Sequence, residues 1–206
     1  MYALKSALQR SYWRLKQLYD TTALLYPREI QIEIPYNSIK STMKKWRKNS
    51  FPPNPTTLEK MAMQLEQPER ARLLEYDVGR LVCRRITDSL GKVHVLLYDT
   101  QFVETVFRSV TRLFVDGTFR TTPNVTDVYQ LLSILGVTYG HALPFAHILM
   151  SSKTEAAYTA VLTEIAQLID SADVSIVMTD FEQAMRNASK TVFTNAHITG
   201  CSVHYD

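Results

Sequence analysis

The sequence predicts an α/β fold with a mixed β-sheet, preceded by a mainly helical N-terminal region, and three observations support this prediction. From residue 112 onward, five short apolar runs have the length of buried strands. The first three follow one another through short links, as the strands of a meander do. Apolar residues at helical spacing alternate with the other two runs, which is typical of parallel strands joined by helices. The predicted order is β-β-β-α-β-α-β.

The predicted strands of this sheet are residues 112–119, 129–139, 143–150, 174–179 and 196–203. One helix is predicted at Glu155–Ile169, with Thr154 at its capping position, and another from Asp180 to Phe193, with Phe181 facing inward. The ribonuclease H-like fold has this order of elements. In such a sheet the first strand is central and the fourth lies beside it, so the ends of these two strands meet.

The chain before residue 113 is predicted to be more helical. Residues 3–19 have the spacing of an amphipathic helix, whereas residues 28–34 alternate isoleucine with polar residues and predict a short strand or extended arm. Ser38 is placed to cap a basic helix from Ile39 to Arg47. The further elements expected are a helix at 57–67, strands at 78–83 and 92–98, and a helix or extended connector at 102–110.

A proline-rich stretch marks a boundary, because Phe51–Pro55 has three prolines in four positions and cannot continue a helix. We therefore predict a basic N-terminal region at 1–55, a connecting α/β region at 56–112 and a sheet-forming region at 113–206. The chain's two cysteines make no disulfide framework, which favours a reducing compartment. Lys5, Arg10, Arg14 and Lys16 interrupt the N-terminal apolar residues, so no signal peptide is expected. No segment has the roughly 18 uninterrupted apolar residues of a membrane span, so none is expected.

The net charge of +3 is unevenly distributed. Residues 1–55 hold ten Lys/Arg and three Asp/Glu, which gives +7 and leaves −4 for the rest of the chain. Such a basic region suits a polyanion such as DNA. The residues expected to contact phosphates are Lys40, Lys44, Lys45, Arg47 and Lys48. A solvated helical face without a partner explains the same charges equally well.

Two carboxylates are the main candidates for chemistry. Asp116 follows the apolar run at 113–115 and precedes Gly117, and Asp180 follows the apolar run at 174–179. Side by side at strand ends, two such acids suit Mg²⁺ or Mn²⁺ in phosphodiester chemistry, because hard cations prefer carboxylate oxygens. The alternative is structural: an Asp before Gly is often a turn residue, and an Asp before a helix is often an N-cap.

Cys201 and His204 form a third candidate group near the end of the chain. Thiolate and imidazole are zinc ligands, but a structural zinc site needs four ligands and only His197 lies near in the sequence. Cys201 is equally consistent with a small buried hydrophobe, and His204 with a hydrogen-bonded surface residue. A Cys/His nucleophile is a further alternative, although no orienting third group is evident.

Several motifs together resemble the transposase domain of Mutator-like elements (MULE), from about residue 113 to the end of the chain. The segments that carry the resemblance are Phe114–Phe119, Pro123, Tyr129–Ile134, Leu143–Ala146, Lys153–Tyr158, Thr179–Ala184 and Gly200–Tyr205. Their order and spacing make the combination specific. Upstream, Ile39–Met43 and Trp46–Pro55 look like the region that precedes this domain in animal proteins with a FLYWCH zinc finger.

The resemblance implies a ribonuclease H-like catalytic domain with a metal-binding acidic triad. Asp116 matches its first acid, Asp180 its second, and Cys201 and His204 its C-x2-H signature. The third acid, a Glu, follows that signature at a distance in the family, so we expect a domain that is incomplete at its C-terminus.

The function expected on this basis is that of a partial DNA transposase in the nucleus, with Mg²⁺ or Mn²⁺ as cofactor, DNA as partner and possible self-association. The first rival is a catalytically inactive DNA-binding protein derived from such an element, which would bind no metal. The second is a soluble α/β enzyme that uses the Cys201–His204 pair, for which Cys201→Ala would abolish turnover and Asp116→Ala would not.

Overall fold

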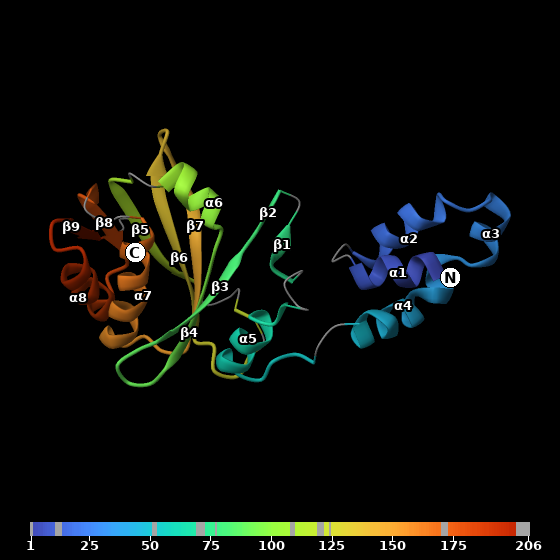
Figure 1. Cartoon of the computed structure of the whole chain (residues 1–206), viewed down its shortest axis with the longest axis horizontal. Helices are drawn as coiled ribbons and strands as arrows, with labels where there is room; N and C mark the ends of the chain where they lie inside the picture. Colours follow the sequence, from blue (N-terminus) through green and yellow to red (C-terminus); the bar gives the residue numbers. More distant parts are fainter. Residues whose placement is uncertain are drawn as a thin grey trace. The chain divides into compact units, whose positions relative to one another are not determined.

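The structure is a computed structural model that describes residues 2–10, 14–50, 53–68, 73–76, 78–107, 110–118, 122–123, 125–169 and 173–200 (Figure 1). The chain divides into two compact units, residues 1–54 and residues 55–206. Each unit has buried hydrophobic residues of its own. None of the helices in the described ranges is long and apolar enough to cross a bilayer.

The described secondary-structure elements of the N-terminal unit are all helices. Its helices are α1 (Tyr2–Arg10), α2 (Leu15–Ala23), α3 (Arg28–Glu33) and α4 (Tyr36–Ser50). A small core is formed by Leu4, Leu8, Leu18, Ile39 and Met43. On α4, Ile39 and Met43 are one turn apart and therefore lie on the same side of the helix. The opposite side of α4 is left to its charged residues.

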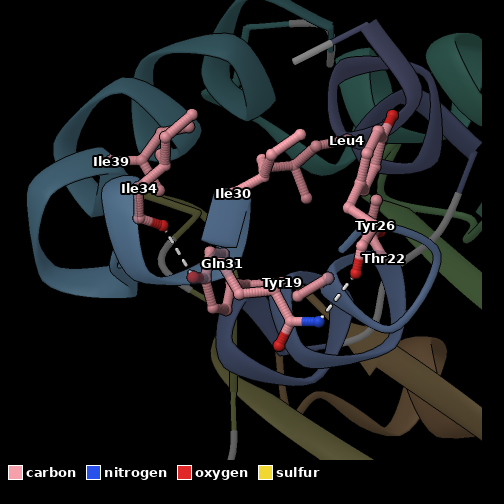
Figure 2. A pocket seen from close by; sticks show the side chains of 9 residues that line it. Leu4, Tyr19, Thr22, Tyr26, Ile30, Gln31, Ile34 and Ile39 are labelled. Carbon is pink, nitrogen blue, oxygen red and sulfur yellow. Dashed lines mark hydrogen bonds between the residues drawn. The ribbon is translucent and has the colours of Figure 1, made fainter. Parts of the chain in front are cut away.

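Residues 28–34 are not the strand that their alternating isoleucines predicted, because Arg28–Glu33 form helix α3. A strand needs a hydrogen-bonding neighbour, and the described elements around this segment are all helices. Ile30 and Ile32 are 42% and 71% exposed, so their alternation does not mark a buried face. Instead, the Gln31 side chain donates to the Tyr26 carbonyl at 2.9 Å, next to an apolar pocket (Figure 2).

The other N-terminal boundaries also differ from the prediction. The segment predicted as one helix at 3–19 contains two described helices, and α2 begins anew where the Gln17 side chain accepts the Arg14 backbone N–H at 3.2 Å. Helix α4 begins before the predicted Ile39 and continues past Arg47. Ser38 lies inside it and donates its hydroxyl to the Pro35 carbonyl at 2.7 Å, so it does not act as the predicted cap.

The C-terminal unit contains a seven-stranded mixed sheet among its described residues. Its strands are β3 (Val82–Thr87), β4 (Val93–Tyr98), β5 (Arg112–Thr118), β6 (Gln130–Thr138), β7 (His141–Met150), β8 (Ile176–Thr179) and β9 (His197–Gly200). The order is β3-β4-β7-β6-β5-β8-β9. The pairs β5–β8 and β8–β9 are parallel, and the other neighbours are antiparallel. The mixed sheet and the place of β5 between β6 and β8 agree with the prediction.

Helices lie on both faces of this sheet (Figure 1). Helices α7 (Glu155–Leu168) and α8 (Gln183–Val192) pack on one face, in a core that includes Leu96 and Ile148. Helix α5 (Leu58–Leu65) packs on the other face, against Val95 and Leu149. The two faces separate because alternate residues of a strand point to opposite sides. As predicted, the Thr154 hydroxyl caps α7 by accepting the Ala157 backbone N–H.

Some elements of this unit differ from the prediction. Strands β3 and β4 extend the sheet beyond β7, so part of the region between residues 56 and 112 shares the sheet of the residues that follow. The predicted strand at 78–83 is divided between β2 (Gly79–Arg80), which pairs with β1 (Glu75–Tyr76), and the start of β3. The segment at 102–110 contains the end of α6 (Thr100–Phe102) and the π-helical turn η2 (Val103–Phe107).

Helix α8 starts at Gln183, two residues after Phe181 and three after Asp180, the residues predicted to begin it, and Glu182 rather than Asp180 is at its N-cap position. Asp180 and Phe181 therefore lie in the turn between β8 and α8. Phe181 is 46% exposed and does not face the core as predicted. Its ring lies against Gly200 instead. The contact is close, since a Cβ atom added to Gly200 would be only 2.4 Å from the Phe181 Cζ atom.

Candidate functional site

Asp116 and Asp180 lie at the same end of two neighbouring parallel strands. The register of β5 and β8 pairs Val115 with Thr179, and each acid is the next residue along its chain. Neighbouring strands are about 4.8 Å apart. The backbones of the two acids are thus adjacent at the carboxyl-terminal end of β5 and β8, and both residues are half-buried.

Asp116 belongs to a row of polar residues that crosses three strands. Its carboxylate accepts a long hydrogen bond from the Thr118 hydroxyl at 3.4 Å. It is paired across β5 and β6 with Ser133, and the Ser133 hydroxyl lies 3.1 Å from Nδ1 of His147 on β7. Burial lowers the pKa of His147 below its usual value, which favours the neutral ring near pH 7.

Asp180 reaches toward β5 at Gly117. A Cβ on Gly117 would lie 3.7 Å from the Asp180 Oδ2 atom and 3.2 Å from the Gln130 Oε1 atom. Because side chains alternate between the two faces of the sheet along β5, a side chain at residue 117 would point to the face opposite to Asp116 and Thr118. The absence of a side chain at Gly117 therefore leaves space beside the Asp180 carboxylate and the Gln130 amide oxygen. The Asp180 Oδ2 atom thus lies on the face of β5 opposite to the Asp116 side chain, so the two acids share the end of the sheet but not one face of it.

A hydrogen-bonded network adjoins Asp180 and connects β6, α7 and the start of α8. Tyr158, which is fully buried, donates its hydroxyl proton to Glu182 Oε2 at 3.1 Å. Lys153 Nζ donates to the same oxygen at 3.3 Å. The Gln130 amide donates to the Tyr158 hydroxyl at 2.8 Å. We call Gln130, Lys153, Tyr158 and Glu182 the Glu182 cluster.

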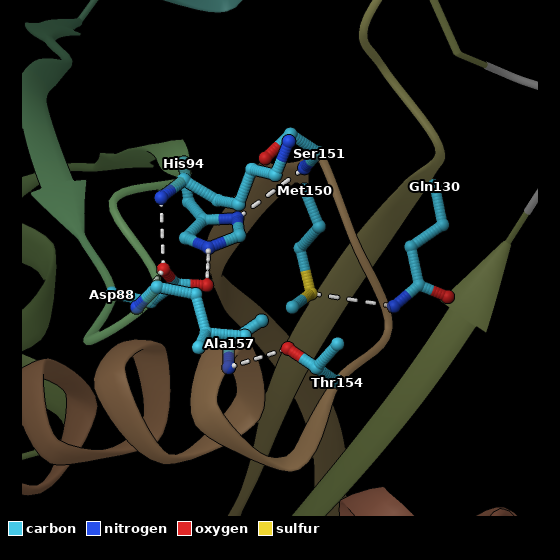
Figure 3. Close-up of polar contacts among 9 residues, drawn as sticks. Asp88, His94, Gln130, Met150, Ser151, Thr154 and Ala157 are labelled. Atoms are coloured by element: carbon cyan, nitrogen blue, oxygen red, sulfur yellow. Dashed lines mark hydrogen bonds and ion pairs between the residues drawn. The ribbon is translucent and has the colours of Figure 1, made fainter.

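The hydrogen bonds of the Glu182 cluster orient the Gln130 amide. A carboxylate can only accept, so the single Tyr158 proton goes to Glu182 and the Tyr158 oxygen accepts from Gln130 Nε2. The same Nε2 lies 3.3 Å from the Met150 sulfur (Figure 3). Gln130 Oε1 is then left on the Gly117 side, buried and without a hydrogen-bond partner among the described residues.

Sequence reasoning did not single out the Glu182 cluster. Tyr158 and Glu182 enter the sequence analysis only as members of the segments that carry the family resemblance, without a role of their own. One indication was available: a tyrosine on the buried side of a helix has a hydroxyl that needs a partner. Burial, first of all, and the nearby Glu182 and Asp180 carboxylates raise the pKa of Tyr158, so it remains a hydrogen-bond donor.

A second polar group, with two completely buried side chains, lies at the carboxyl-terminal end of β7, next to Met150 (Figure 3). Ser151 donates its backbone N–H to His94 Nδ1 at 3.3 Å, and His94 Nε2 lies 3.3 Å from Asp88 Oδ2. Both the His94 and the Asp88 side chains are 0% exposed. Burial lowers the pKa of His94 despite the Asp88 carboxylate beside it. His94 is therefore a neutral ring that donates to Asp88.

The metal-binding capacity of the described residues is limited. Within them, no group of three or more His, Cys, Asp or Glu side chains is arranged to hold a metal ion. Cys201 and His204, which the sequence offered as zinc ligands, lie outside the described residues. The carboxylates at the ends of β5 and β8 therefore remain the main candidates.

Four of the five basic residues proposed to contact phosphates are exposed on α4. These are Lys40, Lys44, Lys45 and Lys48. Arg47 is half-buried, and burial lowers the pKa of its guanidinium group. The lysines lie away from Ile39 and Met43, the α4 residues in the core, so this helix presents a basic face.

The fold and the site define a mixed α/β domain with carboxylates at the ends of adjacent parallel strands. Residues 112–205 match the family model of the MULE transposase domain. The match begins with β5 and includes Asp116, Asp180 and the whole Glu182 cluster. It indicates a transposase-related function and implies interaction with DNA. A search among curated proteins finds no match.

Proposed function

We propose that this chain is a transposase-related protein whose ribonuclease H-like domain binds Mg²⁺ or Mn²⁺ through Asp116 and Asp180 and acts on DNA phosphodiester bonds. The observation that carries the proposal is the parallel register of β5 and β8, which brings two acids distant in sequence to the same end of adjacent strands. The match at residues 112–205 supports the class of reaction.

The residues at this end of the sheet have the donor chemistry that such a cation needs. Mg²⁺ retains several waters and is commonly held by one or two protein carboxylates, which Asp116 and Asp180 supply. When bound, the ion would activate water and stabilise the leaving oxygen of the cleaved bond. Gly117 leaves room beside Asp180 for a substrate phosphate to approach the backbone.

The chain's own residues would orient the DNA. The four exposed lysines of α4 would bind phosphates without reading the sequence. The 15 residues of α4 span about 22 Å, a length that reaches several phosphates of one duplex.

Metal titration of single-site variants tests the proposal. Mn²⁺ binding to the full chain should be lost or weakened at least about tenfold in Asp116→Asn and Asp180→Asn. The matched control is Asp173→Asn, since Asp173 is an exposed acid of the same unit. Equal Mn²⁺ affinity in the wild type and in the Asp116→Asn/Asp180→Asn double variant would exclude this site.

A transposase-derived protein that binds DNA without catalysis is the second candidate. It is favoured by the lack of a group of three acids among the described residues and by the basic face of α4. This candidate predicts DNA binding that is unaffected by EDTA and by Asp116→Asn, but weakened when Lys40, Lys44 and Lys48 are replaced by Gln. A DNA substrate with a labelled end separates the two candidates, because only the first predicts Mn²⁺-dependent cleavage.

A further inference from the structure

Asp180 lies in a turn of residues 180–182. The other two residues of this turn, Phe181 and Glu182, contact distant parts of the chain. Phe181 covers Gly200 at the end of β9, and the Arg186 guanidinium lies 5.8 Å from the Phe181 ring centre. Glu182 is bonded to Tyr158 and Lys153, which belong to α7 and to the segment that precedes it. The backbone path from residue 180 to residue 182 is thus determined by tertiary contacts.

The Glu182 side chain does not cap its own helix, α8. It occupies the N-cap position of α8, yet its side chain makes no capping hydrogen bond. Its Oε2 atom accepts from both Tyr158 and Lys153 instead. A charge-assisted bond to lysine and a bond to a buried phenol are stronger and more directional than a bond to water. The carboxylate therefore connects the start of α8 to α7.

Tyr158 connects this contact to the sheet beneath it. Its hydroxyl accepts from Gln130, the first residue of β6, and Gln130 lies against Gly117 of β5. A continuous path of contacts thus runs from the strand that carries Asp116, through Gln130 and Tyr158, to Glu182 in the turn that carries Asp180. Every member of this path is at least half-buried.

We propose that Tyr158 is a positioning residue. Together with Lys153 and Glu182 it holds the turn of residues 180–182, and it thereby fixes the position of Asp180 relative to Asp116. This inference rests on the proposed function, because it treats Asp180 as a metal ligand. The cluster itself is not a metal site: Glu182 Oε2 is occupied by two donors. Its role is to support the ligand, as partners behind a metal ligand commonly do.

Tyr158→Phe is the sharpest test, because it removes one hydroxyl and keeps the ring in the core. Both hydrogen bonds of that hydroxyl are lost, so Mn²⁺ affinity of the full chain should fall about tenfold. Backbone amides of residues 180–186 should exchange with deuterium several times faster in the absence of metal. Tyr139→Phe is the control, since Tyr139 is 87% exposed at the β6–β7 turn and should change neither quantity.

Two Glu182 variants separate positioning from general destabilisation. Glu182→Gln keeps a carbonyl oxygen that can accept from Tyr158, whereas Glu182→Ala keeps none. We expect Glu182→Gln to retain most of the Mn²⁺ affinity and of the protection at residues 180–186, and Glu182→Ala to lose both. Faster exchange spread equally over the interior of α7 in Tyr158→Phe would indicate a loosened fold and would overturn the assignment.

The exchange experiment also distinguishes this inference from the proposed function. If the wild type binds no Mn²⁺, the proposed metal site fails, but the metal-free exchange of residues 180–186 still decides whether the cluster holds the turn. If the wild type binds Mn²⁺ and Tyr158→Phe matches it in affinity and in exchange, the metal site stands and the positioning role of Tyr158 is wrong.

Discussion

The C-terminal unit contains two polar groups whose surroundings differ. Asp88 and His94 are fully buried, and Asp88 accepts from the Leu90 and Lys92 backbones as well as from His94. Asp116 and Asp180 are only half-buried, and the Gln130 oxygen on the Gly117 side has no hydrogen-bond partner among the described residues. Complete burial and mutual pairing make the first group suited to stability, whereas the partial exposure of the second suits binding.

The largest effect that we expect is from His94→Ala. The variant removes a fully buried ring, leaves a cavity, and deprives Asp88 and the Ser151 N–H of a partner. The free energy of unfolding should fall by about 3 kcal/mol, as measured by urea denaturation. His141→Ala, at an exposed position, is the control. A loss below about 1 kcal/mol would mean that this group is less important for stability than its burial suggests.

Replacing Asp88 and Asp116 by Asn compares the fully buried polar group with the half-buried one. Asp88→Asn should lose about 2 kcal/mol of unfolding free energy, because an amide N–H₂ would face the donating His94 ring. Asp116→Asn should change the unfolding free energy by no more than about 0.5 kcal/mol, since Asp116 is half-buried and the hydrogen bond that it accepts from Thr118 is long, at 3.4 Å. Similar losses in both variants would remove the distinction between the groups.

The pH dependence of stability should follow the buried pair. In the folded state the pKa of His94 is lowered from its ordinary value of 6.5. At pH values between the folded and the unfolded pKa, the unfolded chain therefore binds a proton at His94 and the folded chain does not. Stability is then full above about pH 6.5 and decreases as the pH falls toward the folded pKa; His147 acts in the same direction. The lowered pKa of Asp88 adds a further loss below its ordinary value of 3.8.

Urea denaturation between pH 8 and pH 5 measures this slope. His94→Gln can donate to Asp88 and accept from Ser151 without titrating, so its stability should depend less on pH in this interval. His147→Gln, which removes an exposed histidine of β7, should flatten the curve to a smaller extent. An unchanged slope in His94→Gln would assign the pH dependence to other groups.

A smaller loss of stability than in His94→Ala or Asp88→Asn is expected at Gly117, next to the half-buried acids. Gly117→Ala places a Cβ 3.2 Å from Gln130 Oε1 and 3.7 Å from Asp180 Oδ2, a crowding that a small shift of the amide relieves. The unfolding free energy should fall by roughly 1 kcal/mol, and Mn²⁺ affinity should fall with it. Tyr139→Phe, at an exposed position of the β6–β7 turn, is the control. No change in either quantity would show that the space at Gly117 is not needed.

Local patterns alone predicted much of this chain. Apolar runs identified the strands that became β5 to β9, and Thr154 identified the start of α7, because burial and capping depend on residues close in sequence. The same reasoning placed Asp116 and Asp180 after strands. It was wrong for residues 28–34, where alternation of isoleucine was not accompanied by a pairing partner and the chain formed α3.

What the sequence determined by itself was therefore the class of fold, the order of its elements and the two acids at strand ends, since each is encoded in residues within one or two turns of one another. Only the tertiary structure showed that β3 and β4 extend the same sheet, that His94 and Asp88 pair out of water, and that Tyr158 and Lys153 bind Glu182 behind Asp180. These contacts join residues far apart in the chain, and their energies depend on distance, direction and burial, which no local pattern records.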